Sequence, residues 1–388
     1  MTYNFDEPRD RRTTNSLKWD YAKRFTGREG LLPLWVADMD FATPPAITEA
    51  LVRRIEHGIF GYAQFPPSYF ESVRMWVKKR HDWEISEDWI VPIPGIVPGI
   101  RIAVEAYTHQ GEKIIIQPPV YYPFRNIIAG NGRQVLENPL TRDGSRYLMN
   151  FEQLEGIVDD DTRALLLCSP HNPVSRVWNA KELGALAELC TRRGLLLISD
   201  EIHCDLIMSG SRHLPAATFF PERENRSITF MSATKSFNLS GISCANAIIP
   251  DPFLRKTYSR QVMKEALQLP NLVSIVAAEA AYRHGEEWLT QVLAYIESNY
   301  RYLVEFLKAK TPELTVFPLE GTYLVWVDLS TTGLGDEEIK TRLLDEGLWL
   351  DDGPMFGSGG AGFQRINIAC PRATLEDAMN RFVRAVGR

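Results

Sequence analysis

The sequence predicts an α/β protein in which a large domain with a mostly parallel, doubly wound sheet is joined to a smaller α+β domain. Nearly continuous apolar runs are typical of strands covered on both faces, and five occur here, at residues 113–117, 165–168, 195–198, 227–231 and 245–249. Helical patterns separate several of them, which favours crossover connections. After about residue 270 long helical tracts alternate with short strands. We therefore expect a large domain at residues 45–280 and a small domain formed by residues 1–44 and 281–388.

The first long helix should begin after Thr43, because a hydroxyl residue followed by prolines is a typical helix start. Ile47, Leu51 and Ile55 recur at a spacing of four residues and predict one buried face up to His57. Further helices are predicted over residues 68–81, 100–109, 180–193 (with Asn179 and Glu182 as a capping pair), 271–310 (interrupted near residue 284), 336–346 and 373–386. Strands are predicted over residues 322–328 and 365–369, and a mobile loop over 357–362.

Composition indicates an ordinary globular protein. The 388 residues are 45% apolar and 24% charged, and the net charge of −6 argues against nucleic-acid and anionic-membrane partners. The first 18 residues are polar, which is unlike a secretory signal, and no apolar run is long enough to span a bilayer. The five scattered cysteines form no Cys-x-x-Cys pair. We expect them to be reduced and mostly buried, in a cytoplasmic protein.

A lysine with two neighbouring hydroxyl groups follows one of the predicted strands. Ser232, Thr234 and Lys235 come directly after the run 227–231. Most lysines are solvated surface charges. An amine held beside hydroxyl groups at the end of a strand is also what a pyridoxal phosphate (PLP) Schiff base requires, because the cofactor offers an aldehyde and a phosphate together.

Three other polar clusters follow predicted strands, and ligands bind at the carboxyl ends of parallel strands. Asp200 could cap a helix, or could keep the nitrogen of a pyridine ring protonated. Asn172 could form a turn, or could donate to the phenolic oxygen of the cofactor. Tyr121 could be a packed aromatic residue, or could stack on the cofactor ring, with Tyr122 as its rival.

Two more segments have both a structural and a functional interpretation. Gly95 to Gly99 precede a helix, and such a turn can bring backbone N–H groups to a phosphate. Arg365 lies inside a strand-like run, where it could form a structural ion pair or clamp a substrate carboxylate. The seven histidines show no metal-ligand spacing, so no metal site is expected; His171 and His203 should serve or adjoin the organic site.

With these motifs the chain resembles fold-type I PLP enzymes of the class I/II aminotransferase superfamily, and within them the bacterial cystathionine β-lyase / C–S lyase branch. The resemblance runs nearly end to end. It is carried by residues 18–21, 34–41, 60–62, 168–173, 176–178, 199–203, 232–238 and 362–372.

The resemblance implies a role for each candidate residue. Lys235 would form the Schiff base and move the α-proton, and Tyr121 would stack on the ring in a catalytic position. Asp200, Asn172 and His203 would contact the cofactor ring, while Ser232, Thr234, Ile96 and Val97 would hold its phosphate. Arg365 would bind the substrate carboxylate, in a pocket formed partly by Trp35–Ala37, Tyr323 and residues 357–362. Tyr62 would reach the phosphate of a neighbouring subunit, making a homodimer obligatory.

Two positions depart from the pattern of many aminotransferases. Ser243 stands where an arginine often grips the phosphate, and His203 replaces a common tyrosine. Both departures suit the lyase branch. The resemblance thus implies β-elimination from L-cystathionine or a related L-cysteine S-conjugate, giving pyruvate, ammonia and a thiol. The alternatives are an aminotransferase, which would use the same lysine, and a PLP-binding regulator that acts through a protein partner.

Overall fold

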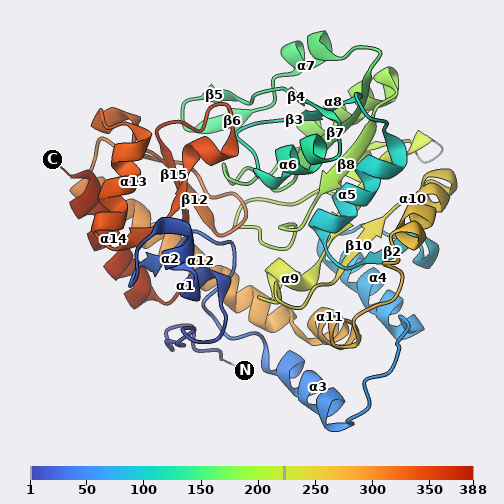
Figure 1. The fold of residues 1–388 in the computed structure, drawn as a ribbon, viewed down its shortest axis with the longest axis horizontal. Helices are drawn as coiled ribbons and strands as arrows, with labels where there is room; N and C mark the ends of the chain where they lie inside the picture. The colour runs from blue at the N-terminus through green and yellow to red at the C-terminus, as the bar shows by residue number, and fades with distance from the viewer. Residues whose placement is uncertain (1, 222–223, 388) are drawn as a thin grey trace.

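A seven-stranded sheet forms the centre of the larger part of the molecule (Figure 1). The computed structural model describes residues 2–221 and 224–387. The strand order is β2-β10-β9-β8-β7-β3-β4. The strands are β2 (Ile90–Ile93), β3 (Lys113–Ile116), β4 (Gln134–Glu137), β7 (Thr162–Cys168), β8 (Leu196–Asp200), β9 (Ser227–Met231) and β10 (Ala245–Ile248). The run from β9 to β4 is parallel, and β10 is antiparallel to both of its neighbours. All five predicted apolar strands are therefore confirmed.

Helices cover both faces of this sheet, as the apolar runs predict. In β7, Ala164 and Leu166 belong to one hydrophobic cluster, with residues of the helices α5 (Ile96–Tyr107) and α6 (Pro123–Gly130). Leu165 and Leu167 belong to another, with residues of α7 (Phe151–Ile157) and α8 (Ala180–Arg193). Successive side chains of a strand point to opposite faces, so this alternation is the signature of a doubly wound sheet.

A second, four-stranded sheet lies in the C-terminal part, with the order β11-β12-β15-β14. Its strands are β11 (Thr315–Val316), β12 (Leu324–Asp328), β14 (Asp351–Asp352) and β15 (Phe363–Asn367). The N-terminal strand β1 (Leu32–Pro33) pairs in parallel with β13 (Leu348–Trp349), which joins a segment from the N-terminal part to one from the C-terminal part. The predicted α+β character is confirmed, and the domain boundaries stay a prediction.

Most predicted helices are present within one or two residues. The Asn179–Glu182 capping box of α8 is complete, with both reciprocal hydrogen bonds. The remaining helices are α1 (Leu17–Asp20), α2 (Ala22–Thr26), α3 (Pro45–Glu56), α4 (Pro67–His81), α9 (Ala233–Ser236), α10 (Pro252–Lys264), α11 (Leu272–His284), α12 (Glu286–Lys310), α13 (Asp336–Asp345) and α14 (Arg372–Val386). The short strands β5 (Thr141–Asp143) and β6 (Arg146–Leu148) form a separate pair.

Two predicted helix starts are wrong. Thr43 does not cap α3, because its hydroxyl donates to the Phe237 carbonyl oxygen at 2.9 Å and the N-cap is Pro44. The helix predicted from Ile100 already begins at Ile96. Proline is tolerated in a first helical turn, where its missing N–H has no intrahelical partner in any case, so Pro98 does not delay the start.

The glycine-rich segment 357–362 has a closely packed base. A Cβ atom on Gly353 would lie 1.9 Å from the Gly360 carbonyl oxygen, and one on Gly360 would lie 2.0 Å from that of Gly353. Glycine at both positions permits this approach of one backbone to another. The predicted loop is thus held at its base by contacts that no other residue type would allow.

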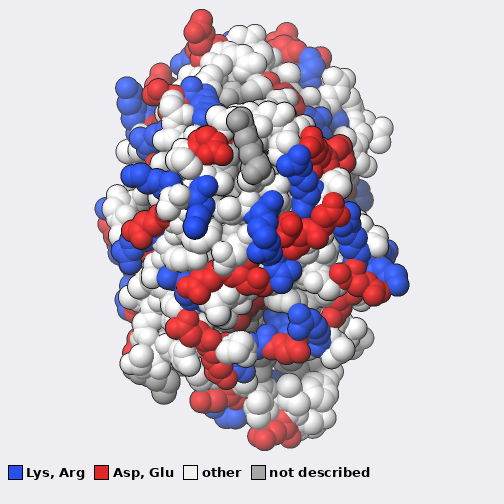
Figure 2. All heavy atoms as spheres, turned by 90° about the vertical axis from the view of Figure 1, so that its left-hand side faces the viewer, with Lys and Arg blue, Asp and Glu red and all other residues white. Residues whose placement is uncertain are grey.

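The surface and the cysteines agree with the compositional expectations. On the face shown in Figure 2, lysine and arginine are intermixed with aspartate and glutamate, so neither sign dominates it. All five cysteines are free thiols and buried. Among the described residues, no helix combines the length and apolar character needed to cross a membrane.

Candidate active site

A cavity of about 250 Å³ lies at the carboxyl ends of the parallel strands, where the sequence predicts the site. Nine of the twelve candidate residues line it: Ala37, Ile96, Val97, Tyr121, Asn172, Asp200, His203, Thr234 and Lys235. Ser243, one of the two departures, lines it too. Ser232 and Arg365 contact members of this lining, whereas Tyr62 is 98% exposed. The predicted cluster is therefore brought together within one chain, with Tyr62 outside it.

Lys235 lies in the short helix α9 with its amine inside the cavity. Its Nζ donates to the Ala37 carbonyl oxygen at 2.5 Å and to the Ser240 hydroxyl at 3.2 Å. Burial lowers the pKa of Lys235 to about 8, although Asp38 and Asp200 favour the charged form. An amine with a lowered pKa is more often neutral near pH 7 and is therefore a better nucleophile and base.

The two hydroxyl groups beside Lys235 have different positions. The Ser232 hydroxyl donates to the Cys244 carbonyl oxygen at 2.6 Å and accepts from the Thr234 backbone N–H at 3.1 Å, so it caps α9. Thr234, in contrast, lines the cavity. Ser232 therefore shapes the turn that carries Lys235, and Thr234 is the hydroxyl residue that lines the cavity.

Asp200 ends β8 with a carboxylate that has little compensation for its burial. Within the described residues, the one hydrogen bond that it accepts comes from the Ile202 backbone N–H at 3.1 Å. Burial raises the pKa of Asp200 to about 7, and Glu201 raises it further while Lys235 opposes the shift. A buried carboxylate without a cationic partner is costly, so this group is suited to a positively charged ligand nitrogen.

Two ring side chains complete the lining near Asp200. Burial raises the pKa of Tyr121, which keeps its hydroxyl protonated. Tyr121 lines this cavity, whereas the rival Tyr122 is not among its lining residues and packs edge-on against Phe356, with 5.9 Å between ring centroids. Burial lowers the pKa of His203 to about 3, and the charges of Lys235 and Arg365 lower it further. His203 is therefore neutral, and its Nδ1 lacks a hydrogen-bond partner within the described chain.

Arg365 on β15 forms the structural ion pair that was one of its two predicted interpretations. Its Nη1 donates to the Asn172 Oδ1 at 2.9 Å, which places the guanidinium beside the cavity. Its Nη2 donates to the Trp35 carbonyl oxygen at 2.7 Å and also to Asp351. The structural ion pair is thus present, and the role of Arg365 as a substrate clamp stays a prediction.

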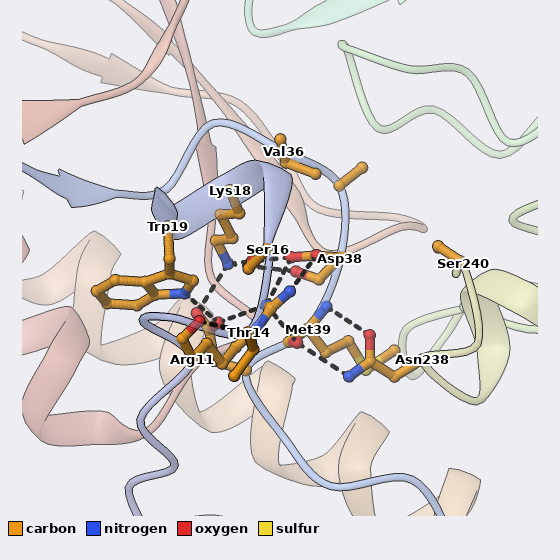
Figure 3. A network of polar contacts seen from close by, with 12 residues as sticks. Arg11, Thr14, Ser16, Lys18, Trp19, Val36, Asp38, Met39, Asn238 and Ser240 are labelled. Atoms are coloured by element: carbon orange, nitrogen blue, oxygen red, sulfur yellow. Dashed lines mark hydrogen bonds and ion pairs between the residues drawn. The ribbon is translucent and has the colours of Figure 1, made fainter. Parts of the chain in front are cut away.

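Sequence reasoning missed the network that holds residues 35–41, here called the N-terminal strap (Figure 3). Arg11 donates to both oxygens of Asp38, at 3.0 and 2.6 Å, and to Asp40 at 2.8 Å. Lys18 is buried and donates to Asp40 at 2.7 Å, and Trp19 donates to it at 3.0 Å. The closely spaced acids of the strap could have indicated this network from the sequence, since buried carboxylates need cationic partners.

Two asparagines fix the strap to the rest of the site. The Asn238 side chain accepts from the Met39 N–H at 3.0 Å and donates to the Met39 and Phe41 carbonyl oxygens. The Asn367 amide donates to the carbonyl oxygens of Val36 and Asp38, at 2.6 Å each. These contacts set the position of the Ala37 carbonyl that receives Lys235.

One cluster outside the cavity has metal-ligand residue types. Candidate ligand atoms of His81, Cys204 and Asp205 lie within 4.8 Å of one another. The Asp205 carboxylate, however, already pairs with the His81 ring at 3.1 Å and accepts from Trp76 and from Ser236, at 3.1 and 2.7 Å. These contacts give Asp205 a structural role next to Lys235.

Comparison with known proteins agrees with this geometry. The family model for aminotransferase class I and II matches residues 29–382. Cystathionine beta-lyase PatB of Bacillus subtilis is 39% identical over 99% of this chain and 100% of its own length, and protein MalY of Escherichia coli is 31% identical over 99% of both. Two solved structures are also similar to this chain. Cystalysin from Treponema denticola, which contains a pyridoxal 5′-phosphate cofactor, has a TM-score of 0.95 and 34% identity over 99% of each chain. The PLP-bound C-S lyase from Staphylococcus hominis has a TM-score of 0.94 and 33% identity over 100% of this chain and 99% of that one. The chain therefore belongs to the aminotransferase class I and II family.

Proposed function

We propose that this protein is a PLP-dependent carbon–sulfur β-lyase that cleaves L-cystathionine or a related L-cysteine S-conjugate to pyruvate, ammonia and a thiol. The observation that carries the proposal is that Lys235 and Asp200 line the same cavity. A buried amine with a lowered pKa and a buried carboxylate that forms no ion pair within the described residues face the same space. The relatives support this reaction, since they include cystathionine beta-lyases and a C-S lyase.

The residues present fit the cofactor. The incompletely paired Asp200 carboxylate would hold the pyridine nitrogen, and the Asn172 amide would donate to the phenolic oxygen. The N-terminus of α5, with Ile96 and Val97 in the cavity wall, together with Thr234, would bind the phosphate, because free N–H groups and the helix dipole favour an anion there. When bound, PLP supplies an electron sink for the negative charge that forms at the substrate Cα.

The protein's own residues then position the substrate and move its proton. The Arg365 guanidinium binds the α-carboxylate, which orients the Cα–H bond. Lys235 Nζ removes the α-proton as general base. The Cβ–S bond breaks and the sulfur leaves as a thiolate, which takes up a proton. The remaining unsaturated amine reacts with water to give pyruvate and ammonia.

The test is to incubate the purified protein and PLP with L-cystathionine in the absence of any keto acid. Pyruvate and homocysteine in equal amounts would establish the β-lyase. If no pyruvate formed, but an added keto acid were aminated by an amino-acid donor, the protein would be an aminotransferase and the β-lyase proposal would be wrong. If the protein catalysed neither reaction at a measurable rate and a pull-down found a stable protein partner, the PLP-binding regulator would be favoured.

The same proposal includes a homodimer in the cytoplasm. Tyr62 lies in a segment where Ile55, Ile59 and Phe60 are also exposed, at 53 to 65%. Burial of such neighbouring apolar side chains against a second copy would stabilise a dimer. Tyr62 would then bind the phosphate in the partner's cavity.

Replacing Tyr62 with alanine should weaken PLP binding about tenfold, because one hydrogen bond to a charged phosphate is lost. The chain should still fold, since the Tyr62 side chain is 98% exposed in the single chain and contributes little to its packing. The measurement is a fluorescence titration of apoprotein with PLP. Phe253→Ala, at a residue 80% exposed on α10, is the matched control and should bind PLP normally. Equal PLP affinities of the two variants would remove Tyr62 from the site.

A further inference from the structure

Asp351 contacts the proposed substrate clamp from the neighbouring strand. The edge strand β14 pairs antiparallel with β15, and Asp351 lies directly opposite Arg365. Both side chains are buried, and Nη2 of Arg365 donates to Oδ2 of Asp351. A carboxylate of the protein itself therefore occupies the guanidinium that is proposed to bind the substrate carboxylate.

The donors of Arg365 can be accounted for one by one. A guanidinium has five N–H donors, and it grips a carboxylate with two parallel bonds through either of two forks, Nη1 with Nη2 or Nε with Nη2. Both forks need Nη2, whose two hydrogens are used by the Trp35 carbonyl oxygen and by Asp351. Nη1 donates to Asn172, and Nε is buried without a hydrogen-bond partner among the described residues. A substrate carboxylate can therefore form two parallel bonds only if Nη2 is released.

We propose that Asp351 is an affinity-determining residue that competes with the substrate α-carboxylate for Nη2 of Arg365, and that substrate binding displaces Asp351 in its protonated form. This inference rests on the proposed function, because it takes Arg365 as the carboxylate clamp. Because Asp351 must leave Arg365 before a ligand can bind, the site selects ligands whose own carboxylate binds Arg365 well.

The surroundings of Asp351 make protonation accessible near neutral pH. Burial raises the pKa of Asp351 to about 6; Arg365 opposes this shift and the adjacent Asp352 adds to it. Asp352 is itself paired with Lys340 of α13 at 3.4 Å. Tyr122, in the turn before α6, is a further titratable group that interacts with Asp351.

The structure also offers the displaced side chain a place. A second cavity of about 240 Å³ lies next to the pair, and its lining includes Asp351, Trp35, Trp349 and Met355. The protonated carboxyl group is neutral, so entry into this largely apolar space costs far less than entry of a carboxylate would.

The test compares the holoenzyme with Asp351→Asn, which keeps the shape and removes the charge. Pyruvate formation from L-cystathionine is measured from pH 5 to 8.5. The wild-type KM should exceed that of the variant about tenfold at pH 7, because the carboxyl group must then be protonated about one unit above its pKa. The KM ratio should approach one below pH 5 and rise with pH, while kcat changes little. Taking the ratio at each pH cancels the titration of the substrate amine and of Lys235.

Asp352→Asn is the matched control. Asp352 is adjacent on the same strand, but its carboxylate accepts from Gln364 at 3.1 Å. Because the Asp352 charge contributes to the raised pKa of Asp351, this variant should have a KM equal to or slightly above the wild-type value near pH 7, and not the lowered KM of Asp351→Asn. If instead Asp351→Asn raised KM, Asp351 would orient Arg365 and the proposed competition would be wrong.

A second readout does not depend on turnover. L-Alanine has the α-carboxylate and amine of the substrate but no leaving group. Its binding is followed by calorimetry in two buffers of different ionisation enthalpy, which gives the number of protons taken up. At pH 7 the wild type should take up about one proton more than Asp351→Asn. Equal uptake by the two proteins would overturn the inference alone. An unchanged KM in Arg365→Lys would instead show that the clamp assigned in the proposed function is wrong.

Discussion

Replacing Lys235 with alanine should lower pyruvate formation about 10³-fold or more. The variant loses the general base, whose contribution alone is about 10² to 10⁴-fold. It also loses the amine that binds the cofactor covalently in the proposed function. The measurement is pyruvate release from L-cystathionine under saturating PLP, together with the visible absorption of the bound cofactor.

The Lys235→Ala variant should fold normally, because removing a buried amine leaves a small cavity and no unpaired charge. Lys181→Ala, on the exposed side of α8, is the matched control and should keep full activity. A small primary amine added to Lys235→Ala should restore part of the rate, since it can replace the missing base. Turnover of Lys235→Ala at the wild-type rate would contradict the assignment.

Replacing Asp200 with asparagine should lower the activity of the holoenzyme at least 10²-fold while it stabilises the apoprotein. The activity falls because a neutral amide cannot hold the pyridine nitrogen in its protonated, electron-accepting form. The stability rises because Asp200 has a folded-state pKa of about 7, above its ordinary value of 3.8. Between these two pH values the folded protein binds more protons than the unfolded chain, so the stability of the wild type falls as pH rises.

The expected size of this stability effect follows from the pKa difference. At pH 8 the apoprotein of Asp200→Asn should exceed the wild type in free energy of unfolding by on the order of 4 kcal/mol, and the difference should vanish below pH 4. Denaturant unfolding of the two apoproteins at pH 4, 6 and 8 measures it. Asp377→Asn, which removes an exposed carboxylate of α14, should show no such trend. Equal stability at all three pH values would mean that Asp200 is compensated by contacts not recognised here.

The position of the site could be predicted because it depends on local sequence. Each parallel strand ends at the same edge of the sheet, so the residues that follow β7, β8 and β9 must meet there. Asn172, Asp200 and Lys235 each stand within a few residues of such an end, and the structure places all three in one cavity.

The contacts that were missed depend on strand pairing and on distant segments. Asp351 meets Arg365 because β14 pairs with β15 in one particular register, and two-residue strands such as β14 leave no periodic signal. The N-terminal strap meets Asn238 and Asn367 across most of the chain length. Thr43 had the right residue type for a cap, but a tertiary hydrogen bond to Phe237 used its hydroxyl.

The pairing of Leu32 with Leu348 constrains the order in which a newly synthesised chain can be completed. β1 directly precedes the N-terminal strap, so the strap cannot be anchored beside β13 until residue 348 has left the ribosome. The seven-stranded sheet, whose last strand ends at Ile248, has all of its residues available much earlier. Contacts between such distant segments form slowly. The Lys235 segment is therefore synthesised long before the opposite wall of its cavity can be anchored, and translation that stops before β13 should yield an inactive protein.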